Sequence, residues 1–285
     1  MSLVVIGLSI GMLLFLLAAG LTVIFGMLGV INFAHGTLYM LGAYAAYQIV
    51  QWTGNFWIGL VISPIIVALA GGLIEVLTLR PLYGRDHAYQ LLLTFGWVLV
   101  IEEAVRLVWG VNFMAVNAPP SLAGTTETFG STIVDYRLFI IEFGTLLSAA
   151  LFLVLEKTRV GMVVRAASSN SEMTSCLGID VARVRTAVFM AGTALAAIGG
   201  AVAGPLLPLK FSMGSTIIID CFVVIIIGGL GNIRGAIFGA LLIGMTRALG
   251  QQFASDWINL LTYSLLILTL VIRPEGLFNR RGRVA

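Results

Sequence analysis

Long apolar stretches with few charges recur along this chain of 285 residues and constrain its fold more than any other feature. A helix of about 20 apolar residues crosses the roughly 30 Å hydrocarbon layer of a membrane, and it satisfies its own backbone hydrogen bonds there. Five stretches have about the required length, and four are shorter. The long stretches are residues 3–30, 57–79, 88–109, 138–155 and 186–207, and the shorter ones are residues 37–50, 217–230, 235–250 and 258–272. The sequence therefore predicts an all-α, polytopic transmembrane helical bundle with eight or nine spans, some short or broken, in a single transmembrane domain that covers residues 1–285.

Composition excludes several other classes of protein. Charged residues make up only 10% of the chain, against about 25% in a soluble domain, so the chain lacks the polar surface that a water-soluble fold needs. No basic tract with interleaved aromatic residues indicates nucleic-acid binding. Cys176 and Cys221 have no metal-ligand spacing, and neither Lys157 nor Lys210 belongs to a phosphate-binding loop. We therefore expect no enzyme activity and no catalytic, cofactor-binding or metal-binding residues in this chain.

Positively charged residues indicate the orientation, because they are enriched in cytoplasmic connections. Twelve of the sixteen lie in four groups, namely within residues 80–85 and 157–185, at Arg234 and within residues 273–283. We expect these groups on the cytoplasmic side. With nine spans, the C-terminus is then cytoplasmic, the N-terminus is external and residues 111–136 form an external loop.

Polar, glycine-containing breaks interrupt two of the apolar regions. NFAHG at residues 32–36 precedes one short apolar run, and NIRG at residues 232–235 precedes another. Matching broken segments in two halves of a chain are typical of transport sites. We expect Asn32 to cap a helix of 14 residues (37–50), which at 1.5 Å per residue is about 21 Å long, too short to cross the layer alone. Asn32 and His35 either satisfy a buried helix break or line the solute path, and Asn232 is the matching pathway candidate in the second half.

Each ionisable residue near a span is either a functional residue or an ordinary charge at the end of a helix. A charge inside a membrane is a functional candidate by default, so Asp220 is a further pathway candidate, unless it lies at the outer mouth. Glu75 lies about one turn before Arg80, and Glu102 lies four residues before Arg106. We expect both to be ordinary pairs at helix ends.

Small residues at every fourth position predict two helix-packing faces, because they let helix backbones approach closely in a membrane. One face consists of Gly192, Ala196, Gly200 and Gly204, and the other of Gly231, Gly235 and Gly239. We expect each face to pack tightly within the chain or against a partner.

Residues 156–185 form the longest predicted cytoplasmic segment. Ser171 is expected to cap a short helix that begins at Glu172, and Gly178 to end it in a left-handed conformation. Asp180 can then cap the next spanning helix. This short helix presents Met173 and Leu177, so it is a candidate docking element for another protein.

The same segment carries a family resemblance. Glu172 and Gly178 have the spacing of the EAA loop, the coupling helix of ABC importer permeases, although Met173 and Thr174 replace its two alanines. Arg165-Ala166 and Leu177-Gly178-Ile179 are similar to the version found in the branched-chain amino acid permease family. Similar stretches cover residues 20–44, 228–244 and 273–278, so four motifs occur in order over nearly the whole chain. The length resembles that of the shorter, LivH-type member of the permease pair. Asp220 falls where members of the family vary.

The resemblance implies an ABC importer permease in a bacterial or archaeal cell (inner) membrane. It implies a second, LivM-type permease subunit, two cytoplasmic ATPases that bind ATP and Mg, and an external solute-binding protein. The chain would translocate branched-chain or other hydrophobic amino acids into the cytoplasm. The residues implied in coupling to the ATPases are Arg165, Glu172, Met173, Leu177 and Gly178.

Three alternatives remain open on the sequence. Related importers carry urea, short amides or organic acids, which would change the cargo and leave the fold class unchanged. An ion-coupled secondary transporter or a channel would work without ATP and would depend on ionisable residues such as Asp220. A purely structural membrane subunit would have no solute path.

Overall fold

Helices form almost all of the regular structure in the computed structural model, which describes residues 2–128, 131–253 and 255–278. The α-helices are α1 (Ser2–Leu28), α2 (His35–Thr53), α3 (Phe56–Ile74), α4 (His87–Trp109), α5 (Asp135–Lys157), α6 (Arg159–Ser169), α7 (Ser171–Cys176), α8 (Val181–Ala203), α9 (Met213–Gly228), α10 (Ile233–Phe253) and α11 (Ile258–Ile272). A π-helical turn η1 (Glu75–Leu79) and short 3-10 turns η2 (Arg80–Leu82), η3 (Pro120–Leu122) and η4 (Ser255–Trp257) complete the helical elements. Strands β1 (Thr125–Thr128) and β2 (Ser131–Val134) pair antiparallel within the predicted external loop, a hairpin that the sequence reasoning did not foresee.

Each of the nine predicted apolar stretches overlaps a helix, so the all-helical, multi-pass prediction is confirmed. Among the described residues, six helical segments are long and apolar enough to cross a membrane. They are α1, α3 with η1 and η2, α5, α8, α10, and η4 with α11. The helices at the other three predicted stretches, α2, α4 and α9, are shorter or contain more polar residues.

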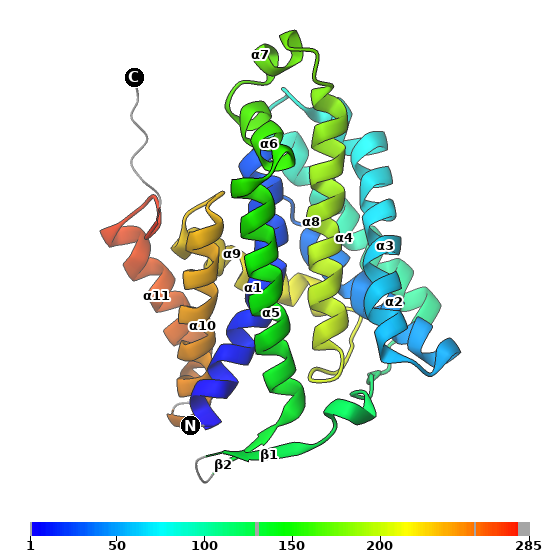
Figure 1. Ribbon diagram of the computed structural model, residues 1–285, viewed down its shortest axis with the longest axis vertical. Coiled ribbons are helices and arrows are strands. Elements are labelled where there is room, and N and C mark those ends of the chain that lie inside the picture. The colour runs from blue at the N-terminus through cyan, green and yellow to red at the C-terminus, as the bar shows by residue number, and fades with distance from the viewer. Residues whose placement is uncertain (1, 129–130, 254, 279–285) are drawn as a thin grey trace.

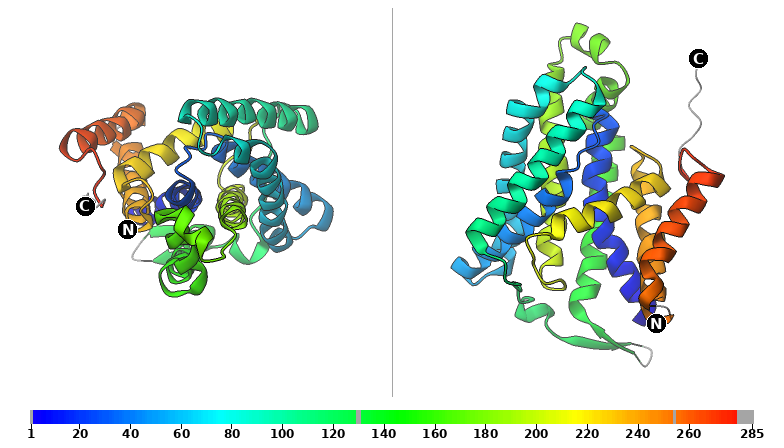
Figure 2. Two further views of the ribbon diagram at one scale, coloured as in Figure 1. Left: turned by 90° about the horizontal axis from the view of Figure 1, so that it is seen from above. Right: turned by 180° about the vertical axis from the view of Figure 1, so that it is seen from behind.

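Helices α1 and α8 lie at the centre of the bundle. α1 packs against α8, α10, α5 and α9, and α8 packs against α1, α2 and α3. Seen from above, α2 to α4 lie on one side of this central pair and α9 to α11 on the other (Figure 2). Residues 14–22 of α1 are all buried, as expected for an apolar helix surrounded by others.

The two ends of the bundle carry different elements. Helices α6 and α7 project at one end, and the β1–β2 hairpin and the start of α1 lie at the other (Figure 1). The α3–α4 and α9–α10 connections and the end of α11 point toward the α7 end. The predicted groups of positive charge among the described residues therefore gather at one end of the molecule.

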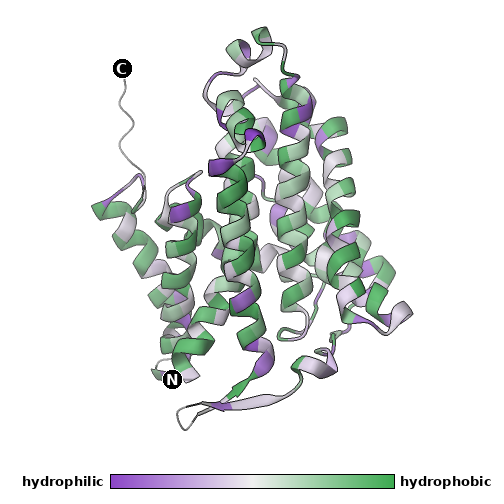
Figure 3. Ribbon diagram, in the orientation of Figure 1, coloured by the Kyte–Doolittle hydropathy of each residue, from purple (hydrophilic) through white to green (hydrophobic). Residues whose placement is uncertain are grey.

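The outermost helices show most of their apolar surface. In the most apolar 18-residue stretch, only 11% of the residues are buried in α5 and in η4 with α11, against 67% in α1 and in α8. Figure 3 shows that these outer helices are largely hydrophobic along their length. A membrane is the environment that suits such a surface.

Glycines mark the closest helix contacts. A Cβ atom at Gly192 would meet the Ile24 side chain of α1, and one at Gly200 would overlap the carbonyl oxygen of Tyr39 in α2. Gly235 and Gly239 of α10 lie in the same way against the backbone of α9.

Two glycines of the predicted packing faces lie outside helices. Gly204 follows the last residue of α8 and contacts Val116 of the long loop. Gly231 precedes α10, has φ +77° and lies against Gly26 of α1. The helical spacing of four was thus misleading at these two positions, because a chain that leaves a helix no longer follows its period.

Helix α2 corrects the prediction of a short, broken helix. It has 19 residues, from His35 to Thr53, and is therefore about 28 Å long at 1.5 Å per residue. This length is close to the thickness of the hydrocarbon layer. The break itself is present, because Gly29 (φ +66°) ends α1 and the chain is non-helical before α2 begins.

Candidate functional site

The predicted cytoplasmic segment folds into α6, α7 and the start of α8. Asn170 lies between α6 and α7, and its Oδ1 accepts a hydrogen bond from the Met173 N–H at 2.9 Å. Asn170, and not the predicted Ser171, therefore caps α7. Gly178 has φ +82° and ends the turn, and Asp180 Oδ1 accepts a hydrogen bond from the Arg183 N–H at 3.1 Å at the start of α8.

Helix α7 presents exposed apolar side chains at a polar end of the molecule. Met173 is 60% exposed and Leu177 75% exposed, and Glu172 is exposed beside them. Thr174 faces inward, is buried, and donates its hydroxyl to the Asn170 carbonyl oxygen at 2.8 Å. The arrangement is a small, internally anchored knob with an apolar tip, which suits a contact with another protein.

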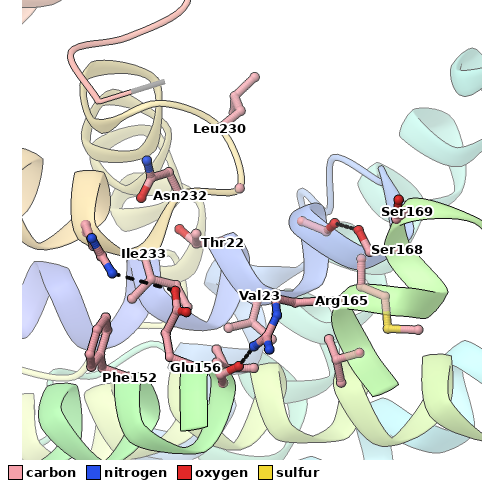
Figure 4. A pocket seen from close by; sticks show the side chains of 16 residues that line it. Thr22, Val23, Phe152, Glu156, Arg165, Ser168, Ser169, Leu230, Asn232 and Ile233 are labelled. Atoms are coloured by element: carbon pink, nitrogen blue, oxygen red, sulfur yellow. Dashed lines mark hydrogen bonds and ion pairs between the residues drawn. The ribbon is translucent and has the colours of Figure 1, made fainter. Parts of the chain in front are cut away.

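A cavity of about 450 Å³ lies beside α6, between α1, the end of α5 and the α9–α10 connection (Figure 4). Arg165 and Asn232 both line it, so the structure brings together two predicted residues from distant parts of the sequence. Arg165 donates a hydrogen bond to the Leu155 carbonyl oxygen. The Asn232 side chain donates to the Phe278 carbonyl oxygen at 2.8 Å and accepts from the Gly235 N–H at 3.3 Å. Asn232 therefore caps α10 and holds the stretch that follows α11.

Other groups of the cavity wall include both signs of charge. Glu156 lies 3.9 Å from Arg234, whose guanidinium carbon is 5.1 Å from the centroid of the Phe152 ring. Thr22 is buried, and its hydroxyl has no hydrogen-bond partner among the described residues. The cavity is thus a mixed polar and apolar recess at the end of the bundle where α6 and α7 project.

The helix break before α2 buries an amide group without hydrogen bonds. Asn32 is 1% exposed, and neither its Nδ2 nor its Oδ1 has a partner in the part of the chain that the structure describes. Only its backbone acts at the start of α2, because the His35 N–H donates to the Asn32 carbonyl oxygen at 3.2 Å. The expected side-chain cap by Asn32 is therefore wrong.

His35 differs from Asn32 because it has a partner. Its imidazole is fully buried, and Nε2 lies 3.0 Å from the carbonyl oxygen of Leu17 in α1. A carbonyl oxygen can only accept, so Nε2 carries the proton and links α2 to α1. The ring also fills the space beside Gly20 where α1, α2 and α8 meet. Asn32 and His35, which were predicted to have the same role, therefore differ: the His35 side chain has a hydrogen-bond partner and, among the described residues, the Asn32 side chain has none.

Asp220 pairs with a charge on the neighbouring helix. It lies on α9, is 6% exposed and accepts a hydrogen bond from the Arg247 guanidinium of α10. This ion pair joins the two helices on which the second broken region lies.

The expected pair between Glu102 and Arg106 is not formed. Arg106 binds Glu103, with 2.5 Å between Nη2 and Oε1. The Glu102 carboxylate instead accepts a hydrogen bond from the Ser215 N–H at 3.3 Å, at the start of α9. A spacing of three or four residues places both acidic residues near the arginine, so the spacing alone does not choose between them.

Glu75 forms its predicted pair with Arg80, but it is not a surface residue. The carboxylate is completely buried at the end of α3 and also binds Tyr83 and Thr186. Burial raises the pKa of the Tyr83 phenol, which therefore remains a hydrogen-bond donor. Sequence reasoning missed the part played by Thr186, because 111 residues separate it from Glu75.

These features together define a class of protein. A multi-pass apolar bundle with polar groups buried in its helices, and an exposed helical knob at one end, has the architecture of a membrane permease. The chain belongs to the family described as "Branched-chain amino acid transport system / permease component", which matches residues 3–270. The family resemblance seen in the sequence is thereby confirmed.

Individual relatives are similar over nearly the whole chain. The high-affinity branched-chain amino acid transport system permease protein BraD of Pseudomonas aeruginosa is 30% identical, and the alignment covers 96% of this chain and 94% of BraD. LivH of Escherichia coli K12, described in the same words, is 29% identical with the same coverage. LivM of that organism is 24% identical over 94% of this chain and 68% of LivM. A comparison with solved structures found no match.

Proposed function

We propose that this chain is the permease subunit of an ATP-driven ABC importer and translocates branched-chain or other hydrophobic amino acids into the cytoplasm. The observation that carries the proposal is the α6–α7 knob, with exposed Met173 and Leu177, in a chain similar along its length to branched-chain amino acid permeases. A permease that has no ATP site of its own needs such a contact so that ATP hydrolysis in a partner subunit can change its conformation.

The proposed assembly contains four kinds of subunit in a lipid bilayer. A second, LivM-type permease would complete the pathway, two cytoplasmic ATPases would bind ATP and Mg, and an external binding protein would deliver the solute. We place the α7 end and the C-terminus in the cytoplasm and the hairpin end and the N-terminus outside, because the positive groups lie at the α7 end. Nine spans within one transmembrane domain, in the cell (inner) membrane of a bacterium or archaeon, fit this orientation.

We assign two sets of residues. The coupling set consists of Arg165, Glu172, Met173, Leu177 and Gly178, of which the last four lie in or directly after α7. Asn32 is the pathway residue favoured by its unpaired buried amide. His35, Asp220 and Asn232 each have partners within the chain, which supports positioning roles for them beside the path.

Transport by the reconstituted four-component complex tests the proposal. Proteoliposomes with the wild-type chain should take up a branched-chain amino acid only with ATP and the binding protein. Glu172→Ala combined with Gly178→Val should abolish uptake, because valine cannot adopt the left-handed backbone at residue 178 without strain. Ser171→Ala is the matched control, since the Ser171 side chain does not cap α7.

The same experiment separates the alternatives. Uptake of urea, a short amide or an organic acid in place of amino acids would change the cargo and keep the importer class. Uptake by this chain alone along an ion gradient would show a secondary transporter or channel. Full uptake by the Glu172→Ala, Gly178→Val variant would refute the coupling assignment.

A further inference from the structure

The buried carboxylate of Glu75 lies against the first turns of α8, close to the connection between α7 and α8. Glu75 begins the π-helical turn η1 at the end of α3, and its side chain is 0% exposed. Its oxygens accept hydrogen bonds from the Thr186 hydroxyl at 2.7 Å, the Tyr83 hydroxyl at 3.0 Å and the Arg80 guanidinium at 3.4 Å. Arg80 also donates to the Thr186 hydroxyl, so these four side chains form a closed cluster, which we call the Glu75 cluster.

The Glu75 cluster joins two helices that are far apart in the sequence. Thr186 belongs to α8, whereas the other three members belong to η1, η2 and the residue that follows η2. A second residue of α8 reinforces the contact, because the Arg185 guanidinium carbon lies 5.2 Å from the centroid of the Tyr83 ring. Beyond the cluster, α3 and α8 continue in close contact at Gly71 with Thr193 and at Gly72 with Met190.

The route from the knob to the cluster is short. Four residues, 177–180, connect α7 with α8, and Asp180 caps the first turn of α8. Thr186 follows five residues after the first residue of α8, about 8 Å along the helix. The helical turn that binds Glu75 therefore belongs to the first part of α8 that a displacement of α7 can reach along the chain.

A carboxylate is an unusual way to make such a contact. Burying its charge is unfavourable unless several donors compensate, whereas α3 and α8 pack through small and apolar residues at the next turns. Glu75 is placed at this site by a π-helical turn. Such turns are rare in proteins, and those that occur often lie at functional sites. A cluster of charge-assisted hydrogen bonds also has defined directions, so it resists sliding of the two helices better than an apolar contact does.

We infer that Glu75 is a positioning residue for energy coupling: its carboxylate fixes the first turns of α8 to the end of α3, so that the two helices move as one unit when a partner moves α7. The inference rests on the proposed function, since it names the path by which the ATPase contact reaches the membrane helices. It adds Glu75, Arg80, Tyr83 and Thr186 to the coupling machinery.

Uptake per ATP hydrolysed is the first test, in the reconstituted complex. Glu75→Gln and Thr186→Val should each lower this ratio about tenfold, the effect of losing a hydrogen bond to a charged group, while assembly and stimulated ATP hydrolysis continue. Thr186→Ser keeps the hydroxyl, so this variant should have the wild-type ratio. Glu103→Gln is the matched control, because Glu103 is an exposed carboxylate that also pairs with an arginine. An unchanged ratio in Glu75→Gln, or uptake that falls only in step with the amount of assembled complex, would overturn the inference.

A distance measurement tests the mechanical link without any solute. Spin labels at Ala182 in the first turn of α8 and Arg85 in the η2–α4 connection, both exposed, would be placed in a Cys176→Ser background. In the complex, the separation should stay constant between the nucleotide-free and ATP-trapped states, and it should change between these states in Glu75→Gln. A change in the complex with native Glu75 would overturn the inference. Absence of amino acid uptake by the wild-type complex would instead refute the proposed function, and the label distances would still test the link.

Discussion

Replacement of Asn32 by leucine should separate transport from stability. Asn32 is 1% exposed, and both polar atoms of its side chain lack hydrogen-bond partners among the described residues. A buried amide in this state costs about 1–3 kcal/mol relative to a satisfied one. Leucine has the same branching at Cγ and no polar atoms, so Asn32→Leu should leave the free energy of unfolding unchanged or raise it by up to about 2 kcal/mol. Uptake should nevertheless fall, because a polar group of the path is lost.

Two measurements on one pair of variants test this reasoning. Thermal unfolding of the purified subunit reports stability, and uptake by the reconstituted complex reports transport. His35→Leu is the control, because it removes the hydrogen bond to the Leu17 carbonyl and should destabilise by about 1–3 kcal/mol. A loss of stability in Asn32→Leu as large as that in His35→Leu would show that Asn32 is structural. A stable Asn32→Leu protein with normal uptake would remove it from the path.

Three further outcomes follow from the contacts of α9 and α10. Asp220→Asn should destabilise by about 3 kcal/mol, the low end for a broken buried pair, because it leaves the partly buried Arg247 unpaired, and the double variant Asp220→Leu, Arg247→Met should recover most of that loss in the same unfolding assay. Gly235→Val should prevent the packing of α10 on α9, since even a Cβ atom overlaps the facing backbone, and should be seen as loss of monodisperse protein in gel filtration. Asn232→Ala should cost about 1 kcal/mol as a lost cap and release the Phe278 carbonyl, which faster hydrogen exchange in the stretch after α11 would report.

The positions of the helices could be predicted because lipid imposes a length and a composition on each span. The predicted stretch 138–155 lies within α5, which adds a few residues at each end. Helix α2 was predicted too short for a physical reason. His35, at its start, and Gln51, at its end, are polar, and a polar residue inside a folded bundle cannot be told from one in a loop by hydropathy alone.

Partners of polar groups could be predicted only where local geometry leaves one choice. Asn170 and Ser171 are both good caps, and the backbone before α7, not the residue type, selects Asn170. The link between Glu75 and Thr186 has no local signal, because the fold brings together residues from two helices. The unpaired state of Asn32 was equally hidden, since the sequence offered free N–H groups at the start of α2 that its side chain does not reach.

Because α5 and α11 are mostly exposed at the outside of the bundle, the surrounding lipid can affect how they are tilted. Apolar lipid tails give no hydrophobic drive for a helix to leave them, so these two helices adjust their tilt to the thickness of the bilayer within the limits set by their contacts with α1 and α10. Helix α5 is joined to α6 through the single residue Thr158, so a change in its tilt shifts the base of the knob that α6 and α7 form. If the α6–α7 knob transmits the movement of an ATPase as proposed, the acyl-chain length of the surrounding lipid should change the rate of uptake.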